Sequence, residues 1–175
     1  GILEGQAENP AFKEVLGADV GDRIATLVSL SLTPLRLDEV LAVRPGSGQL
    51  DVRGKAALVC GAPFARLPSD LPERLALSVL DVAGAPIQVS RRARPGDAVV
   101  VLGAGGKSGV LCAFEARRRV GSIGLVIGVE SHAPFAEELR ELGVCDAVLS
   151  LDARDALAVY EAVVSRAGRE VDLSI

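Results

Sequence analysis

A run of glycines directly after a short apolar segment is the feature that most constrains this chain. Residues 98–102 are apolar and rich in β-branched valine, which predicts a buried strand. Four glycines follow at once: Gly103, Gly105, Gly106 and Gly109. Residues 110–116 then have the composition of a helix. A strand, a glycine turn and a helix in this order favour a corner that binds phosphate, because backbone without Cβ atoms approaches an anion closely and the helix N-terminus presents free amides to it.

The spacing of the glycines leaves alternatives open. Gly103, Gly106 and Gly109 satisfy G-x-x-G-x-x-G, whereas a strict G-x-G-x-x-G would need glycine at Ser108. Lys107 and Ser108 also match the end of a P-loop, but Val101 stands where that motif needs its first glycine, which argues against a nucleoside triphosphatase. A bare tight turn between strand and helix is the alternative that involves no ligand.

A second predicted strand, followed by an acidic residue, supports the hypothesis that the chain binds a dinucleotide. Residues 125–129 predict another buried strand, and Glu130 follows it about 20 residues after the glycines, where dinucleotide folds place the acid that binds the adenosine ribose. A carboxylate there repels a 2′-phosphate and so favours NAD over NADP. An ordinary solvated glutamate at a strand end is the alternative. The predicted cofactor-binding residues are Gly103, Gly105, Gly106, Lys107, Ser108, Gly109, Glu130 and Ser131.

Composition narrows the class of protein. Aromatic residues are only 3% of the chain, so the core must be built from Val, Leu, Ile and Ala. A formal net charge of −4 argues against a nucleic-acid partner, and we interpret Arg91–Arg92 and Arg117–Arg119 as solvated surface. No apolar run has transmembrane length and no signal-peptide pattern is visible, which predicts a cytoplasmic protein without a membrane partner. The chain starts at Gly1 rather than methionine, from which we expect a piece of a longer polypeptide.

The three cysteines do not indicate a metal site. Cys60, Cys112 and Cys145 are widely separated and form no C-x-x-C pair. We expect free thiols in a reducing compartment and no bound metal.

The first part of the chain is predicted to be rich in β-structure. Strands are expected at residues 24–28, 29–33 and 56–60, residues 37–43 are ambiguous between helix and strand, and residues 45–48 are expected to form a loop. Two prolines within residues 67–72 mark the best domain boundary. A mostly apolar helix follows at residues 75–83, and Gly84 and Pro86 are expected to break or kink it.

From residue 99 onward, strands and helices alternate. Helices are expected at residues 107–119, 134–142 and 154–167, and strands at residues 99–102, 125–129, 147–149 and 171–175. This alternation predicts an α/β fold with a parallel sheet. The chain stops at the fourth strand, so we expect a sheet whose open edge invites a homo-oligomer.

Three long segments, in order, resemble one known family. They are residues 20–35 (VGDRIATLVSLSLTPL), 75–86 (LALSVLDVAGAP) and 102–112 (LGAGGKSGVLC), and residues 171–175 (VDLSI) match as well. The chain resembles the medium-chain dehydrogenases/reductases and, within them, the L-erythro-3,5-diaminohexanoate dehydrogenase family. The resemblance implies part of a GroES-like β domain at residues 1–70 and a Rossmann dinucleotide-binding domain at residues 71–175, truncated after its fourth strand.

The resemblance also implies an activity. It is the NAD(P)-dependent oxidative deamination of L-erythro-3,5-diaminohexanoate to 5-amino-3-oxohexanoate and ammonia, a step of lysine fermentation. NAD is the expected cofactor and a small diamino acid the expected partner, although this chain alone is expected to be inactive. The alternatives are a zinc-independent quinone or enoyl reductase that uses NADPH, and a non-catalytic dinucleotide-binding module.

The catalytic groups are not identified by the sequence. Asp81 is a weak candidate, because it lies in an otherwise apolar helix where an unpaired carboxylate is costly, and it could meet a substrate amine. An arginine or backbone donors could satisfy it instead. His132, the single histidine, is expected to border an adenosine pocket or to lie in a surface loop. Ser29, Ser31 and Thr33 could line the cleft or face solvent.

Overall fold

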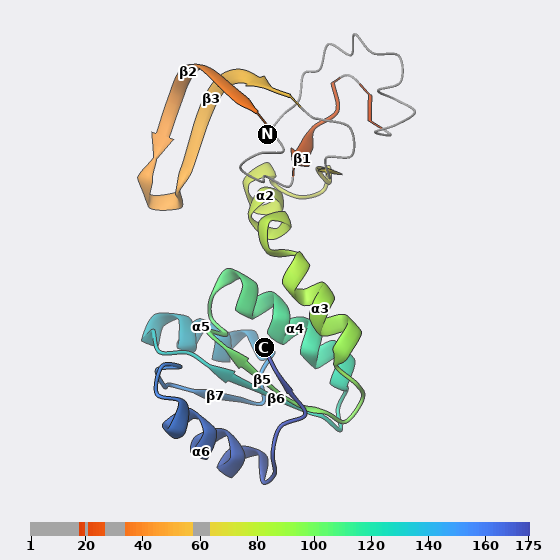
Figure 1. The fold of residues 1–175 in the computed structure, drawn as a ribbon, viewed down its shortest axis with the longest axis vertical. Helices are drawn as coiled ribbons and strands as arrows, with labels where there is room; N and C mark the ends of the chain where they lie inside the picture. The colour runs from red at the N-terminus through yellow and green to blue at the C-terminus, as the bar shows by residue number, and fades with distance from the viewer. Residues whose placement is uncertain (1–17, 20, 27–33, 58–63) are drawn as a thin grey trace. The chain divides into compact units, whose positions relative to one another are not determined.

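The computed structural model describes residues 18–19, 21–26, 34–57 and 64–175. The chain separates into two compact units, residues 1–77 and residues 78–175 (Figure 1). The division falls within helix α2 (Glu73–Val82). The boundary after residue 70, inferred from the sequence, stays a prediction.

The second unit is built on a parallel sheet of four strands. These are β5 (Ala98–Leu102), β6 (Leu125–Val129), β7 (Ala147–Leu149) and β8 (Leu173–Ser174), in the order β7-β6-β5-β8. β5 pairs with β6 on one side and with β8 on the other, both in parallel register. The strand order reverses at β5, and in open α/β sheets ligands bind where this reversal occurs. The predicted α/β fold with a parallel sheet is confirmed.

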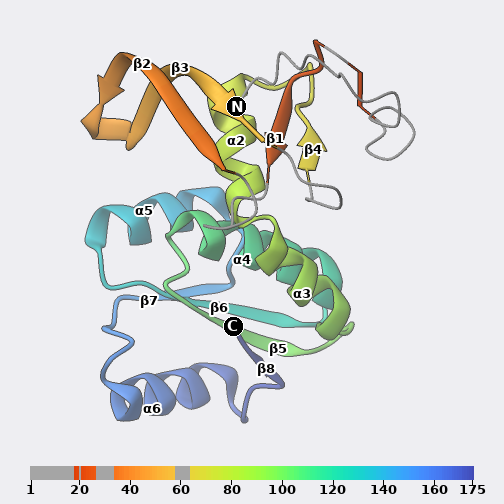
Figure 2. The ribbon, with the colours of Figure 1, turned by 45° about the horizontal axis from the view of Figure 1, so that its top comes forward.

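Helices cover both faces of this sheet. α3 (Gly84–Arg92), α4 (Lys107–Val120) and α5 (Ala133–Leu142) lie on one face, and α6 (Ala156–Ala167) lies on the other (Figures 1 and 2). Every residue of these elements belongs to the part of the chain that the structure describes.

The two faces of β5 contribute to separate cores because side chains alternate along a strand. Val99 and Val101 pack against residues of α3, α4 and α5, whereas Val100 packs against Val163 of α6. β6 repeats the pattern, with Val126 on the first face and Ile127 on the second. The continuous apolar run that predicted a buried strand therefore serves two layers at once.

The segment after α2 differs from the sequence-based expectation. Gly84 and Pro86 interrupt the first helix, as expected, but they also open a second helix, α3, which the sequence did not predict. Proline is tolerated in the first turn of a helix, where its missing N–H has no intrahelical acceptor. Val89 of α3 is buried in the core of the second unit.

The described part of the first unit contains two antiparallel strand pairs. β1 (Ile24–Thr26) pairs with β4 (Phe64–Arg66), and β2 (Leu35–Arg44) pairs with β3 (Gln49–Ala56). The ambiguity at residues 37–43 is thus resolved as strand, and residues 45–47 form a short 3-10 helix, η1, rather than a loop. Of the strand predicted at residues 56–60, Ala56 is the last residue of β3, Ala57 is not in a strand, and residues 58–60 are outside the described part of the chain. β4 was not predicted. Residues 27–33 and 58–63 lie outside the described residues.

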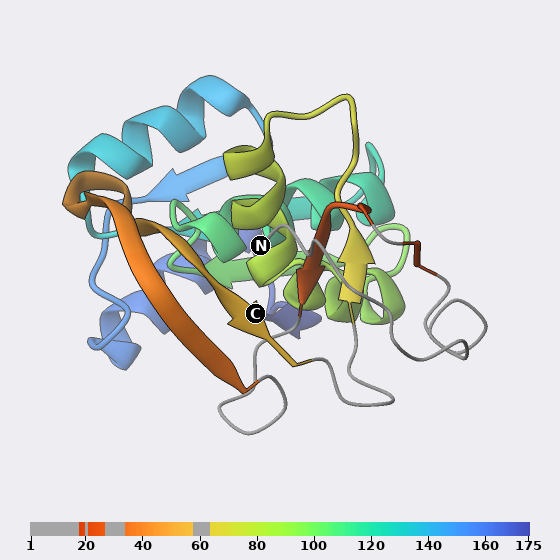
Figure 3. The ribbon, with the colours of Figure 1, turned by 90° about the horizontal axis from the view of Figure 1, so that it is seen from above.

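Figure 3 shows the hairpin of β2 and β3. The register of its cross-strand pairs gives the hairpin one apolar and one charged face. The cross-strand pairs Leu37↔Gly54, Val40↔Val52 and Val43↔Leu50 alternate with pairs that carry polar side chains, such as Glu39↔Arg53. Val43 is 66% exposed and Val40 is 53% exposed. Arg53 and Glu39 form an ion pair across the charged face at 2.6 Å.

One of the predicted surface arginines is instead structural. The Arg117 guanidinium pairs with Asp146 at 2.6 Å and donates to the carbonyl oxygens of Gly121 and Gly124. Asp146 also accepts the amide of Val126, at the start of β6, at 2.7 Å. Arg117 therefore ties the end of α4 to the segments before β6 and β7. Arg91 and Arg92 are exposed, as expected.

The sharpest test of this core compares two isoleucines of the second unit. Ile127 is fully buried on β6, whereas Ile123 is 81% exposed. Ile127→Ala should lower the free energy of unfolding by about 2–5 kcal/mol because it leaves a cavity. Ile123→Ala should change it by less than about 0.5 kcal/mol. Urea denaturation measures both, and equal effects would contradict the layer assignment.

Candidate dinucleotide-binding corner

The turn after β5 is held against the end of β6 by backbone hydrogen bonds. Gly103 has a φ of +67°, in the left-handed region that glycine adopts without strain. The amides of Gly103 and Ala104 both donate to the carbonyl oxygen of Val129, at 2.9 and 3.0 Å. Gly106 donates back to the Gly103 carbonyl at 3.1 Å. This turn, residues 103–106, is called the glycine loop below.

Two glycines allow close approaches that any other residue would prevent. A Cβ at Gly109 would overlap the Gly103 carbonyl oxygen and lie 2.7 Å from Cα of Ala104, so glycine lets α4 begin directly against the loop. A Cβ at Gly105 would lie 2.6 Å from Cβ of Phe135 on α5. At Gly106 the nearest contact would be an ordinary 3.5 Å. The close helix contact therefore belongs to Gly109 rather than to Ser108.

The N-terminus of α4 opens onto this loop. α4 begins at Lys107, and no side chain caps it at Gly106. The amides of Lys107, Ser108 and Gly109 are in the first turn and have no acceptor within the helix. Together with the positive end of the helix dipole they suit an anion such as a pyrophosphate. The open space beside Gly106 fits an approaching phosphate, so the residues present fit the group that the sequence predicts.

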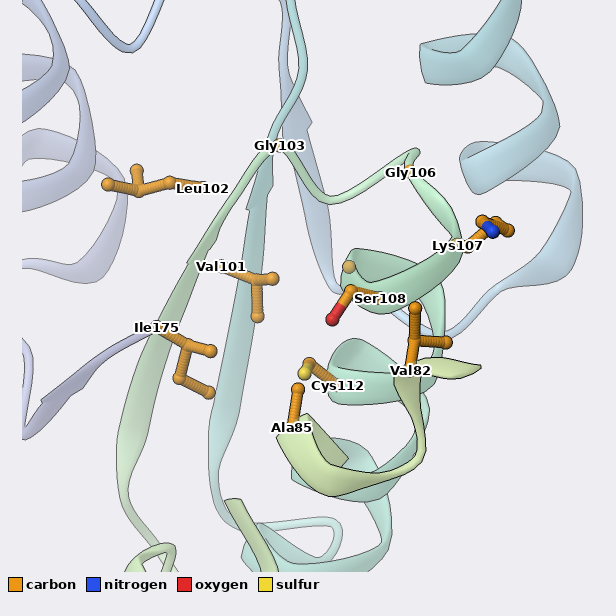
Figure 4. A pocket seen from close by; sticks show the side chains of 11 residues that line it. Val82, Ala85, Val101, Leu102, Gly103, Gly106, Lys107, Ser108, Cys112 and Ile175 are labelled. Carbon is orange, nitrogen blue, oxygen red and sulfur yellow. The ribbon is translucent and has the colours of Figure 1, made fainter. Parts of the chain in front are cut away.

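A hollow of about 390 Å³ lies beside the loop, at the side where the strand order reverses. Figure 4 shows its walls, which are mostly apolar. They are Val82, Ala85, Val101, Leu102, Gly103, Gly106, Lys107, Ser108, Gly109, Cys112 and Ile175. Ser108 and Lys107 are the polar side chains among them. The hollow has the chemistry of a small-molecule site, with an apolar wall and a few polar groups.

The thiol of Cys112 in this wall is kept neutral. Burial raises the pKa of Cys112, and a hydrogen bond with Ser108 lowers it by less. A neutral buried thiol is a poor nucleophile. Cys112 therefore acts as a packing residue in the hollow, in agreement with the free thiols that the sequence predicts.

Glu130 follows β6 as predicted, but its carboxylate faces the glycine loop. The residue is 8% exposed. Oε2 accepts the amide of Gly105 at 3.0 Å, and Oε1 accepts the amide of His132 at 2.8 Å. Glu130 is thus not the solvated strand-end glutamate of the alternative interpretation.

The residues after Glu130 are open to solvent. Ser131 and His132 are exposed, and His132 is the N-cap residue of α5. Its ring lies 4.5 Å from that of Phe135, measured between centroids. The structure thus brings Glu130 to the glycine loop, whereas Ser131 and the His132 ring lie on the surface beside it.

Asp81 does not occupy the environment that the sequence suggested. Its side chain is 68% exposed, so the cost of a buried carboxylate does not arise and that expectation is wrong. The carboxylate pairs with Nζ of Lys107 at 3.3 Å. The partner of Asp81 is therefore Lys107, the first residue of α4, rather than an arginine or a backbone amide.

No metal centre is found in the described part of the chain, where no three His, Cys, Asp or Glu residues come together. Cys145 is partly buried and free. Burial raises the pKa of Cys145 to about 11, with the charge of Asp146 as a smaller cause in the same direction.

Cys60, Ser29, Ser31 and Thr33 lie outside the described residues. Within the part of the chain that the structure describes, none of the helices has the length and the apolar composition of a membrane span.

Part of the wall could not be found from sequence motifs. Val82 and Ala85 reach the hollow from the α2–α3 corner, and Ile175 reaches it from the end of β8. Ile175 accepts the amide of Leu102 at 2.9 Å, next to the glycine loop. The sequence predicted the strand at residues 171–175, but only the structure shows that β8 pairs with β5 and so places residue 175 near residue 102.

Comparison with known proteins gives consistent similarities. Residues 1–68 match the family model described as the L-erythro-3,5-diaminohexanoate dehydrogenase N-terminal domain. A protein of Acetoanaerobium sticklandii named L-erythro-3,5-diaminohexanoate dehydrogenase is 45% identical over 157 residues, covering 89% of this chain and 46% of that protein. The protein of the same name from Fusobacterium nucleatum is 46% identical over the same shares. The chain spans about half the length of these curated relatives.

Solved structures with similar folds are more distant in sequence. A mycobacterial protein complexed with NADPH has a TM-score of 0.70 and 20% identity, and the match covers 99% of this chain and 46% of that one. AibC has a TM-score of 0.61 and 23% identity, over 90% of this chain and 49% of that one. These likenesses confirm the predicted fold class, that of a Rossmann domain preceded by a GroES-like region.

The two glycines at the start of α4 provide a matched test of the corner. Gly109→Ala should destabilise the protein by roughly 1–3 kcal/mol, because the new methyl group overlaps backbone that cannot move without breaking the turn. Gly106→Ala meets only an ordinary contact and should cost clearly less. Thermal denaturation of both variants measures the difference. A Gly109→Ala variant as stable as the Gly106→Ala variant would contradict the close approach of α4.

Proposed function

We propose that this chain belongs to the L-erythro-3,5-diaminohexanoate dehydrogenase family, to which it is similar, and that its second unit binds the nicotinamide dinucleotide with which such an enzyme oxidises its substrate. The observation that carries the proposal is the open N-terminus of α4 against the glycine loop. Three first-turn amides and the adjoining space at Gly106 suit a pyrophosphate.

The side chains around the loop have separable roles in this proposal. The first-turn amides, with the Ser108 hydroxyl, hold the pyrophosphate. Lys107 has an exposed ammonium group at the loop. Once its ion pair with Asp81 breaks, this group would compensate the negative charge of the pyrophosphate. The apolar wall of Val101, Cys112 and Ile175 excludes water from the dinucleotide beside the strand reversal.

We propose NAD rather than NADP as the cofactor. The carboxylate of Glu130 follows β6, the position from which an acidic residue hydrogen-bonds the adenosine ribose in dinucleotide-binding folds. A 2′-phosphate there would meet a negative charge. A carboxylate has about four acceptor sites, so the two backbone amides on Glu130 leave capacity for the ribose hydroxyls.

The reaction proposed for the protein is the oxidative deamination of L-erythro-3,5-diaminohexanoate to 5-amino-3-oxohexanoate and ammonia. When bound, the dinucleotide supplies the hydride acceptor. We also propose that Asp81 binds an ammonium group of the substrate. This ammonium group would compete with Lys107 for the Asp81 carboxylate. A cytoplasmic homo-oligomer also stays a proposal. The names of the relatives do not favour a quinone or enoyl reductase.

Binding can be tested at Gly106. Gly106→Val should weaken NADH binding at least tenfold, because the branched side chain fills the space beside the first-turn amides while the backbone there is extended (φ −73°, ψ 164°) and accepts valine. Gly103 is unsuited to this test, since its φ of +67° would strain a valine. NADH fluorescence titration measures affinity, and circular dichroism verifies the fold. Unchanged affinity would contradict a site at this corner.

Activity is tested with a protein of the relatives' full length that contains this sequence. Such a protein should reduce NAD⁺ in the presence of L-erythro-3,5-diaminohexanoate and release ammonia in equal amount. Formation of NADH at 340 nm and a separate ammonia assay give the stoichiometry. Binding of NADH without turnover would instead favour a non-catalytic dinucleotide-binding module.

A further inference from the structure

The glycine loop is attached to the β6–α5 turn by a single buried carboxylate, that of Glu130. The residue is 8% exposed, and among the described residues no lysine, arginine or histidine forms an ion pair with it. A buried charge without a cation is costly unless hydrogen bonds to the charged form compensate it. Here the compensation comes from the backbone amides of Gly105 and His132, at 3.0 and 2.8 Å.

Gly105 is fitted to this contact. A Cβ at this position would lie 3.0 Å from Oε2 of Glu130 and 2.6 Å from Cβ of Phe135. The loop backbone thus approaches the carboxylate and the first turn of α5 more closely than any residue with a side chain allows. The need for glycine at position 105 comes from Glu130 and Phe135, since neither the α4 contact nor a positive φ requires it.

We propose that Glu130 is a positioning residue that holds the glycine loop in the conformation that receives the pyrophosphate, in addition to any contact with the ribose. One carboxylate oxygen fixes the middle of the loop, and the other fixes the start of α5, so the loop and the turn after β6 form one rigid corner. This inference rests on the proposed dinucleotide site. It makes Glu130 important for the binding of both NAD and NADP.

The proposal differs in its consequences from a purely electrostatic role. If the charge of Glu130 only repels a 2′-phosphate, its removal weakens NADH binding and strengthens NADPH binding. If the carboxylate positions the loop, its removal weakens both, because both dinucleotides carry the same pyrophosphate. Gly105→Ala separates the two roles further, since it keeps the charge of Glu130 and disturbs the packing of the loop against Glu130 and Phe135.

The first experiment measures amide hydrogen exchange in the unliganded protein. Glu130→Ala should accelerate exchange of the Gly105 amide at least tenfold, while the Val110 amide, bonded to the Gly106 carbonyl at 2.9 Å, keeps its rate. Glu130→Gln retains one acceptor and should give an intermediate rate. A Gly105 amide that exchanges at the wild-type rate in both variants would overturn the proposal. This result does not depend on whether the site binds a dinucleotide.

The second experiment measures dissociation constants for NADH and NADPH by fluorescence. Glu130→Ala and Gly105→Ala should each weaken both ligands at least fivefold, and Glu138→Ala, on the exposed side of α5, should weaken neither. NADPH affinity that is unchanged or higher in both variants would overturn the positioning role. If the wild-type protein binds neither dinucleotide, the proposed function fails, and the exchange experiment still decides whether Glu130 holds the loop.

Discussion

The close approach of backbone to backbone at the end of β5 is the constraint on which the rest of the second unit depends. The carbonyl oxygen of Val129 accepts two successive loop amides, from Gly103 and Ala104. Gly109 lets α4 start directly against that loop. Because no side chain intervenes, the helix N-terminus points at the strand reversal with its first amides free. The packing of this corner therefore supports the proposed anion site.

The side chains around the corner divide between holding it in place and facing a ligand. Arg117 and Asp146 connect the far end of α4 to the starts of β6 and β7, and Glu130 connects the loop to α5. The hollow beside the loop is lined instead by small and aliphatic residues, such as Ala85 and Val101, with few polar groups. In the proposed site, such a division makes the helix amides, rather than fixed ion pairs, the main source of affinity for phosphate.

Sequence patterns predicted the second unit more accurately than the first. β6 and β7 have the predicted bounds, because each is a short apolar run between clear turn signals. Helix α3 was missed, since Gly84 and Pro86 indicate an end of structure as readily as a new first turn. In the first unit, β4 has only three residues and pairs with a strand far away in the sequence, so no local pattern revealed it.

By itself, the sequence indicated the strand–glycine–helix pattern and the resemblance to a family, because glycine positions, strand–helix alternation and long matching segments are all local properties of the chain. The tertiary structure alone decided what surrounds each candidate. It placed Asp81 in solvent beside Lys107, turned Glu130 inward onto Gly105, and brought Ile175 next to the loop. The physical reason is that burial and hydrogen-bond partners depend on which segments pack together, and segments distant in the sequence make these contacts only in the folded chain.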